Sequence, residues 1–556
     1  MEQAKRPWLA LAVLCLGTFA VLLDTTIVNV ALPSVIAGLH APLDQAIWVV
    51  NAYLLVFAAL LILAGRLGDL FGPRRLFTAG LALFAPASAA CGAAQSPGEL
   101  IAARAVQGIG AAALTPQVMV IIQQIFPRER MGAAFGVSFS MVGLAAVSGP
   151  VLGGVLTTCL SWRWVFYVNL PIAAAGIALA YAWVPEARNR RRPRLDLVGV
   201  LLASAGLAAV SYGVIECQHY GWGQVRYGIT ILEIIAAGVV LLAGFAAWEW
   251  RHREPLMPLG LFRSGTFAIS VVLSVAVQFA LQSMLLVNSI NLQSVLGFTA
   301  VHAGLTGLPL TLAMTALAPF AGRLTDRLGG RYVLMVGLAV YAAGIAGVAA
   351  VSSTHATSLT FAPVLVVAGL GMGAIFAPLA TMAMRAAPAS LAGAASGVLN
   401  TGRQLGATLG GAITGAVLAS QLATAMHAHA LAAARLLPPP ARQPFVAGFA
   451  RAARDGLQVG RGQGGARIPG GTPRALVPEL SGLIHDVFAR AYITAIHPAL
   501  ALSVVLLIAG ALACLLLRRS PAPAAVPQPG QPAQATQAFL RTAGQTDPSA
   551  TTAAQR

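Results

Sequence analysis

Charged side chains inside long apolar runs are the residues of this sequence that could do chemistry. Asp24 lies sixteen residues into the apolar run 8–32, and Arg104 lies inside the run 98–120. A charge at the centre of a bilayer costs about 2.5 to 3.5 kcal/mol on insertion scales, so such residues usually face a partner or a cavity. Removal from water favours the neutral form of a carboxyl group. Asp24 could therefore exchange protons, or it could be a carboxylate that only packs helices, and Arg104 needs an acidic partner, for which Asp24 is the obvious candidate.

Other polar residues in apolar runs could line a substrate cavity. Their side chains are amides, apart from one arginine, and they are Asn29, Gln278, Gln282, Asn288 and Arg403. Gln278 and Gln282 are four residues apart and therefore share a helical face. Amides of this kind can equally serve as hydrogen bonds between membrane helices. No acidic partner for Arg403 can be identified.

A charged turn motif, GRLGDLFGPRR, occupies residues 65–75. Gly72 and Pro73 predict a tight turn between two helices, with charged residues close enough to pair, namely Arg66, Asp69, Arg74 and Arg75. A second copy, GRLTDRLGGR at 322–331, supplies Arg323 and Asp326. The motif could act as a latch, or it could only anchor the topology.

Small residues and a proline fall together in the run 132–156, as Gly149, Pro150, Gly153 and Gly154. Proline removes a backbone hydrogen bond and glycines remove side-chain bulk, so a helix can bend and pack closely at this point.

The elements that must position these residues are membrane helices. The chain has 556 residues, of which 58% are hydrophobic and 9% charged, with a mean hydropathy of +0.78. Soluble domains average roughly 25% charged residues. Long apolar stretches predict fourteen spans, near 8–32, 45–64, 76–95, 98–120, 132–156, 163–184, 197–215, 227–250, 266–291, 302–321, 332–351, 359–381, 394–420 and 498–517.

The positive charge predicts the orientation of these spans. Connections on the N-terminal side carry twenty-one lysines and arginines, whereas the opposite short loops carry two, Arg163 and Arg226. Because positive loops favour the cytoplasm, we expect both termini inside the cell. The segment 421–497 is then an external loop, either a lid or a variable tether. Its Gly-, Arg- and Pro-rich middle is expected to be flexible, and its alanine-rich flanks could be helical. The tail 518–556 is expected to be disordered. Lys5 is the only lysine, which excludes a P-loop and a lysine Schiff base.

An internal repeat relates the two ends of the chain. An offset of 257 residues carries the turn motif at 65 onto its copy at 322, and Gly149 onto Gly406. We therefore expect an all-α polytopic membrane protein with two six-helix bundles, 8–184 and 266–517, and an inserted helix pair at 196–250. Paired six-helix halves are the architecture of alternating-access transporters.

Five motifs in order make the chain resemble the major facilitator superfamily, and within it the fourteen-helix drug:proton antiporters. They are LDTTIVNVALP (23–33), GRLGDLFGPRR (65–75), RAVQGIG (104–110), GLAAVSGPVLGG (143–154) and WRWVFYVNLP (162–171). The resemblance implies proton coupling at Asp24 and Arg104, gating by the turn motifs, and export as the direction that the Gly149 motif marks. In one respect the chain departs from branch members that export divalent cations, since no acid lies between Asp326 and Asp455. Neutral, lipophilic, monocationic or anionic substrates are favoured.

The function expected from the sequence is proton-coupled export of small amphiphilic drugs or antibiotics across the cell membrane. An uptake permease of the same fold is the alternative, and a membrane-embedded transferase is disfavoured because the histidines are scattered and no catalytic acids cluster. The expected partners are a small-molecule substrate, protons and the lipid bilayer, without nucleic acid, cofactor or metal, and we expect a functional monomer. Cys159 and Cys217 lie near predicted helix ends on one side, where isolated thiols are expected rather than a disulfide.

Overall fold

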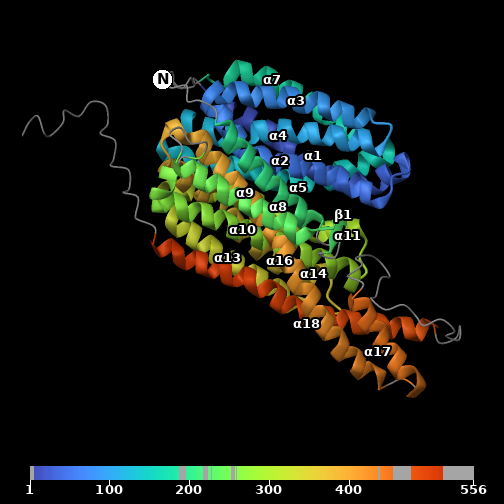
Figure 1. The fold of residues 1–556 in the computed structure, drawn as a ribbon. Coiled ribbons are helices and arrows are strands. Elements are labelled where there is room, and N and C mark those ends of the chain that lie inside the picture. Colours follow the sequence, from blue (N-terminus) through green and yellow to red (C-terminus); the bar gives the residue numbers. More distant parts are fainter. Residues whose placement is uncertain are drawn as a thin grey trace, which may run out of the picture. The chain divides into compact units, whose positions relative to one another are not determined.

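A computed structural model describes residues 6–186, 196–216, 223–226, 228–251, 257, 259–435, 437, 439–454 and 477–516. Fourteen of its helices are long and apolar enough to cross a membrane. The predicted all-α polytopic membrane fold is therefore confirmed. Figure 1 shows the N-terminal helices in blue on one side and the yellow and red helices of the C-terminal part on the other, with green helices between them.

The N-terminal bundle is formed by the helices α1 (Pro7–Leu39), α2 (Leu43–Phe71), α3 (Pro73–Ala93), α4 (Pro97–Ile125), α5 (Met131–Cys159), α6 (Trp164–Tyr167) and α7 (Asn169–Trp183). A short helical turn, η1 (Arg128–Arg130), precedes α5. Proline opens α1, α3 and α4, where its missing N–H costs no helical hydrogen bond. The last two helices, α6 and α7, together make the sixth span.

An inserted helix pair follows, α8 (Leu197–Glu216) and α9 (Ile231–Arg251), joined through the antiparallel strands β1 (Gln224–Arg226) and β2 (Ile229–Thr230). The pair packs on α2 through a small apolar cluster that includes Ile62, Leu207 and Phe245. Within the pair, α8 and α9 cross so closely that a Cβ added at Gly206 would lie 3.1 Å from the carbonyl oxygen of Gly238.

The C-terminal bundle is formed by η2 (Leu259–Arg263), α10 (Gly265–Ile290), η3 (Asn291–Val295), α11 (Ala300–Thr306), α12 (Leu308–Leu328), α13 (Gly330–Val351), α14 (Ser358–Gly373), α15 (Phe376–Ala386), η4 (Ala389–Leu391), α16 (Ala392–Ala434), α17 (Pro439–Arg454), α18 (Val477–Ala513) and η6 (Cys514–Leu516). One element order therefore appears twice, since α2 and α5 correspond to α12 and α16. The contacts between the bundles follow this relation, because α5 packs on α12 and α2 packs on α16.

The two turn motifs adopt the same backbone. Gly72 separates α2 from α3 with φ of 98°, and Gly329 separates α12 from α13 with φ of 86°. These left-handed conformations favour glycine, because a side chain would be strained there. The two glycines are 257 residues apart, so the predicted tight turn occurs at equivalent positions of both bundles.

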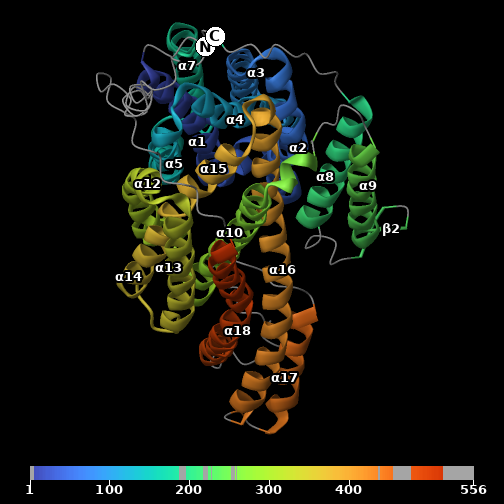
Figure 2. The ribbon, with the colours of Figure 1, turned by 90° about the vertical axis from the view of Figure 1, so that its left-hand side faces the viewer.

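The segment 421–497 contains helices in its alanine-rich flanks, where the sequence allowed them. In its described part it is helical, because α16 continues to Ala434, α17 follows, and α18 begins at Val477. Figure 2 shows these helices extending together beyond the remaining helices. Residues 455–476 and the tail 518–556 lie outside the described residues. So does Cys217, while Cys159 is a free, exposed thiol.

Candidate functional site

A buried ion pair lies inside the N-terminal bundle. The Nη1 atom of Arg104 on α4 contacts the Oδ2 atom of Asp24 on α1, and both residues are 0% exposed. Nε of Arg104 donates to the carbonyl oxygen of Val49 on α2 at 3.1 Å. The two charges predicted to need partners therefore meet each other, away from both lipid and water.

Uncharged polar groups complete the coordination of the Asp24 carboxylate. Its Oδ1 atom accepts from Nε2 of Gln107 at 2.9 Å and from Nδ2 of Asn169, on α7, at 3.0 Å. Oγ of Ser88, on α3, accepts from the same two amides at 3.2 Å and donates to the carbonyl oxygen of Phe166. We call Asp24, Arg104, Gln107, Asn169 and Ser88 the carboxylate cluster. Sequence reasoning missed Ser88 and Asn169, although Asn169 belongs to the quoted motif WRWVFYVNLP.

Aromatic packing covers the guanidinium of Arg104. Its Cζ atom lies 4.3 Å from the centroid of the Tyr53 ring, a cation–π contact worth about 2 kcal/mol when desolvated. Among the described residues, Nη2 of Arg104 and the hydroxyl of Tyr53 are buried without a hydrogen-bond partner. A proton arriving at Asp24 would therefore leave Arg104 without its counter-charge, and breaking a buried pair costs about 3–5 kcal/mol.

Asn29 does not join this cluster. Its Nδ2 atom donates to the carbonyl oxygen of Thr25 in its own helix at 3.1 Å, and the residue is exposed. The asparagine that contacts Asp24 is Asn169. An asparagine five residues along a helix points to a different side of that helix, whereas α7 packs directly on α1.

The carboxylate of Asp69 links the two bundles. It accepts hydrogen bonds from the backbone N–H groups of Gly393 and Ala394 at 2.9 and 3.1 Å. These are the second and third residues of α16, where N–H groups have no partner within the helix. The negative charge of a buried carboxylate at a helix N-terminus is stabilising.

Asp326 makes the equivalent contact in the opposite direction. It lies on α12 and accepts from the N–H groups of Gly132 and Ala133, the second and third residues of α5, at 2.9 and 2.8 Å. Nη2 of Arg385, on α15, also donates to Asp326 at 2.7 Å and contacts the carbonyl oxygen of Arg128. Each bundle therefore caps a helix of the other, and we call the end of the bundles where this occurs the motif end.

Glycines bring the backbones together at the motif end. A Cβ added at Gly65 would lie 2.3 Å from the carbonyl oxygen of Gly393, and one added at Gly322 would lie 2.1 Å from that of Gly132. Real Cβ atoms do not come so close to oxygen, so any side chain would separate the helices. Hydrogen bonds between the bundles cluster here, including Gln123 Nε2 to the carbonyl oxygen of Met384 at 2.6 Å.

The two arginines that follow the turn do not pair with Asp69 as predicted. Arg74 and Arg75 instead form ion pairs with Glu186, just beyond α7, at 3.0 and 2.6 Å. Arg66 is buried one turn before Asp69 on α2. Arg323 is exposed and lies over the ring of Phe320 at 5.8 Å. The prediction missed that backbone N–H groups of the other bundle can satisfy an aspartate.

The glycines of α5 pack it against α1. A Cβ at Gly149 would lie 2.2 Å from Oγ1 of Thr26, and one at Gly153 would lie 3.1 Å from Ile27, whereas nothing lies within 4 Å of one at Gly154. Pro150 is exposed and α5 continues through it. The equivalent glycines of α16, Gly406 and Gly410, pack on α10 in the same way.

The predicted cavity residues of the C-terminal bundle are spread over two helices. On α10, Gln278, Gln282 and Asn288 are half-buried, and Oδ1 of Asn288 has no hydrogen-bond partner among the described residues. Gln282 faces α16, since its Cγ atom would lie 3.6 Å from a Cβ at Gly411. On α16, the guanidinium of Arg403 lies over aromatic rings of α5 and α15. Among the described residues, no group of three or more metal-binding side chains occurs.

Two repeated bundles, a buried ion pair and exchanged helix caps define a membrane transporter fold. The chain belongs to the Major Facilitator Superfamily, whose family model matches residues 14–411. A solved structure of the proton:xylose symporter XylE has the same fold, with a TM-score of 0.54 at 15% identity, and the match covers 73% of this chain and 87% of that one.

Curated relatives of similar length include antibiotic resistance proteins. The tetracenomycin C resistance and export protein of Streptomyces glaucescens is 35% identical over 405 residues, covering 72% of this chain and 74% of the relative. The puromycin resistance protein pur8 of Streptomyces alboniger is 37% identical over 411 residues, covering 72% of this chain and 80% of the relative.

Proposed function

We propose that this protein exports small amphiphilic drugs or antibiotics across the cell membrane in exchange for protons, by alternating access and as a monomer with both termini in the cytoplasm. The observation that carries the proposal is the carboxylate cluster, a fully buried acid held by one arginine and two amides. The relatives that confer antibiotic resistance support export as the direction. The motif end then faces the cytoplasm.

A chain of contacts supports coupling between the proton site and the latches. Thr26 lies two residues after Asp24, and its hydroxyl donates to the carbonyl oxygen of Ala145 on α5 at 3.2 Å. The same hydroxyl faces Gly149 of α5, where an added Cβ would lie 2.2 Å from it. Helix α5 begins at the residues capped by Asp326. Protonation of Asp24 can therefore shift α1 against α5 and so bias the closure of the motif end.

The proton gradient supplies enough energy for this exchange. One proton moving inward through a membrane potential of 100 mV releases about 2.3 kcal/mol, and a pH difference of one unit adds about 1.4 kcal/mol. At about 1.4 kcal/mol per tenfold ratio, the sum sustains roughly a 500-fold gradient of a neutral solute. No nucleotide or other cofactor is needed.

The test is proton-driven transport in proteoliposomes, with tetracenomycin C, puromycin and the dye N-phenyl-1-naphthylamine as probes. Asp24→Asn removes the titratable group, Asp24→Glu retains one, and Glu99→Gln removes an exposed carboxylate of α4 as a matched control. We expect the Asn variant to lose gradient-driven accumulation while the control keeps it. Wild-type efflux rates in the Asn variant would remove Asp24 from proton coupling.

The direction of transport is tested separately. Cells that express an exporter accumulate less of each probe than control cells, whereas an uptake permease makes them accumulate more. Higher accumulation would therefore replace export by uptake in the proposal, whatever the outcome for Asp24.

A further inference from the structure

Arg403 is a half-buried charge that the proton pathway and the latches do not use. It lies eleven positions after Ala392, the first residue of α16, or about 16 Å along the helix axis. A hydrocarbon core is about 30 Å thick, so Arg403 lies near the middle of the bilayer. At that depth an arginine normally faces a partner of opposite charge.

Two aromatic rings hold the guanidinium of Arg403 in place. Its Cζ atom lies 4.7 Å from the ring of Phe139, on α5, and 5.3 Å from the ring of Phe376, on α15. The two rings stack on each other with centroids 5.6 Å apart. Because Phe139 belongs to the N-terminal bundle and Phe376 to the C-terminal bundle, this group is built from both halves of the protein.

No anion compensates this charge within the described residues. Nε of Arg403 is buried without a hydrogen-bond partner, and no ion pair to the residue is found there. The sequence explains why, because the four helices that meet here, α5, α10, α15 and α16, contain no aspartate or glutamate. Asp24 already pairs with Arg104 and Asp326 with Arg385.

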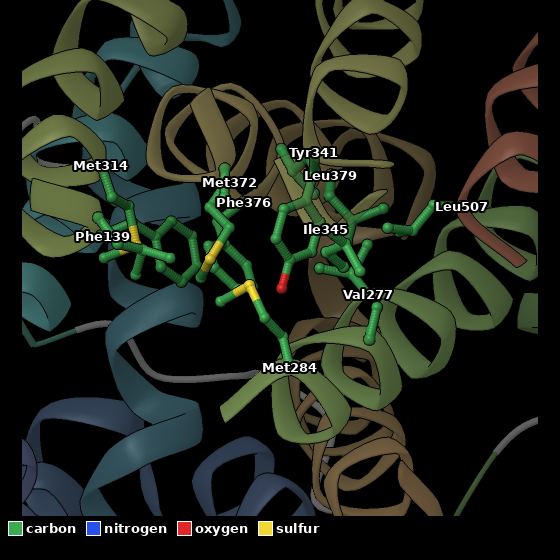
Figure 3. Packing of buried hydrophobic residues seen from close by; sticks show 14 of the residues in the cluster. Phe139, Val277, Met284, Met314, Tyr341, Ile345, Met372, Phe376, Leu379 and Leu507 are labelled. Carbon is green, nitrogen blue, oxygen red and sulfur yellow. The ribbon is translucent and has the colours of Figure 1, made fainter. Parts of the chain in front are cut away.

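The surroundings of Arg403 suit an amphiphilic aromatic ligand. Figure 3 shows Phe139 and Phe376 beside Met314, Met372 and Met284. Methionine side chains adapt to ligands of different shape and make favourable contacts with aromatic rings. A guanidinium can stack on a ring while its N–H groups donate in a bidentate manner to a planar oxyanion.

We propose that Arg403 binds the anionic group of an aromatic substrate, such as a carboxylate, sulfonate or ionised phenol, whose rings lie against Phe139 and Phe376. The inference rests on the proposed export of small amphiphilic compounds and names the charge class that the site selects. Since the site is shared between the bundles, it is assembled when α5 and α15 are together and taken apart when they separate.

The experiment compares two dyes that share one aromatic body. 8-Anilinonaphthalene-1-sulfonate carries a sulfonate, and N-phenyl-1-naphthylamine lacks it. Binding is measured by fluorescence on protein in phosphatidylcholine nanodiscs, with empty nanodiscs subtracted. Arg403→Gln removes the charge, and Arg403→Lys keeps it without the planar fork. Arg490→Gln removes an arginine of α18 whose side chain is 63% exposed, as a matched control.

We expect Arg403→Gln to raise the Kd of the sulfonate dye at least tenfold and to change that of the neutral dye less than twofold. The lysine variant should fall between wild type and glutamine, and the control should match wild type. Equal loss of both dyes in Arg403→Gln, unchanged sulfonate binding, or failure of the wild type to bind the sulfonate dye would overturn the proposal. Displacement of the dye by millimolar chloride would also overturn it, by assigning Arg403 to an inorganic ion. No gradient is applied, so the result is independent of whether transport is proton-coupled.

Discussion

Replacing Asp69 by asparagine should open the motif end. The carboxylate accepts two backbone hydrogen bonds from the start of α16, and its side chain is buried. Hydrogen bonds to a charged group are worth about 1.5–3 kcal/mol each. Asparagine keeps one carbonyl acceptor but loses the charge and the second acceptor, so the closed state should lose about 2–3 kcal/mol in all. At about 1.4 kcal/mol per tenfold, the ratio of closed to open protein falls roughly 30- to 150-fold.

Spin labels on opposite bundles measure this change. Phe71, at the end of α2, is 61% exposed, and Ala389 in η4 is exposed on the other bundle. For labelling, both residues are replaced by cysteine in a variant whose five native cysteines are replaced by alanine. Double electron–electron resonance then gives the distribution of distances between the two spin labels. Asp69→Asn should add a longer distance, while Asp486→Asn, on the exposed part of α18, should not.

The exchanged caps provide a second variant. Asp326→Asn should produce the same longer distance, and the double variant should populate it more than either single one. A distribution identical to wild type in the double variant would refute the view that these carboxylates hold the motif end closed. In that case the close glycine contacts alone would account for the closure.

Three further predictions concern the N-terminal bundle. Gly149→Ala should reduce transport at least tenfold, because its Cβ would lie 2.2 Å from a threonine hydroxyl of α1, whereas Gly154→Ala should transport normally in the same vesicle assay. Tyr53→Phe should leave the melting temperature unchanged, and Tyr53→Leu should lower it, since only leucine removes the ring over Arg104, worth about 2 kcal/mol. Asn169→Ala should lower the melting temperature by removing a charge-assisted hydrogen bond to the buried carboxylate worth about 1.5–3 kcal/mol; an unchanged melting curve would contradict it.

The sequence predicts those parts of the site where a physical requirement, such as the neutralisation of a charge inside the membrane, can be met by only one residue. A lone acid and a lone arginine in neighbouring membrane helices must compensate each other, and Asp24 and Arg104 do so. The absence of acids around Arg403 likewise indicates its missing counter-charge. The turn glycines were predictable because Gly72 and Gly329 recur at one spacing and adopt conformations that favour glycine.

Other parts of the site depend on helix registers that a single sequence does not contain. Asn169 reaches Asp24 only because α7 packs on α1, and Ser88 reaches the amides of Gln107 and Asn169 only because α3 packs on α4 and α7. The partners of Asp69 are backbone N–H groups, which every residue type supplies and no sequence pattern marks. Glu186, which follows α7, forms ion pairs with Arg74 and Arg75. From the sequence alone it was assigned only to the connection after the sixth span.

Hydropathy ended a membrane span at residue 420, while the alanine-rich composition beyond it allowed further helix. A span predicted from average hydropathy ends where the sequence becomes less apolar, although an alanine-rich helix can continue beyond the lipid. Helix α16 therefore runs for 43 residues to Ala434, well past the predicted boundary at residue 420.

The length of α16 turns it into a lever. From Arg403 to Ala434 the helix spans about 46 Å at 1.5 Å per residue, and no proline interrupts it. A tilt of 10° about Arg403 would then displace the far end of the helix by about 8 Å. A fluorophore at the exposed Leu431 would therefore report a small rearrangement at Arg403 as a larger, readily measured displacement.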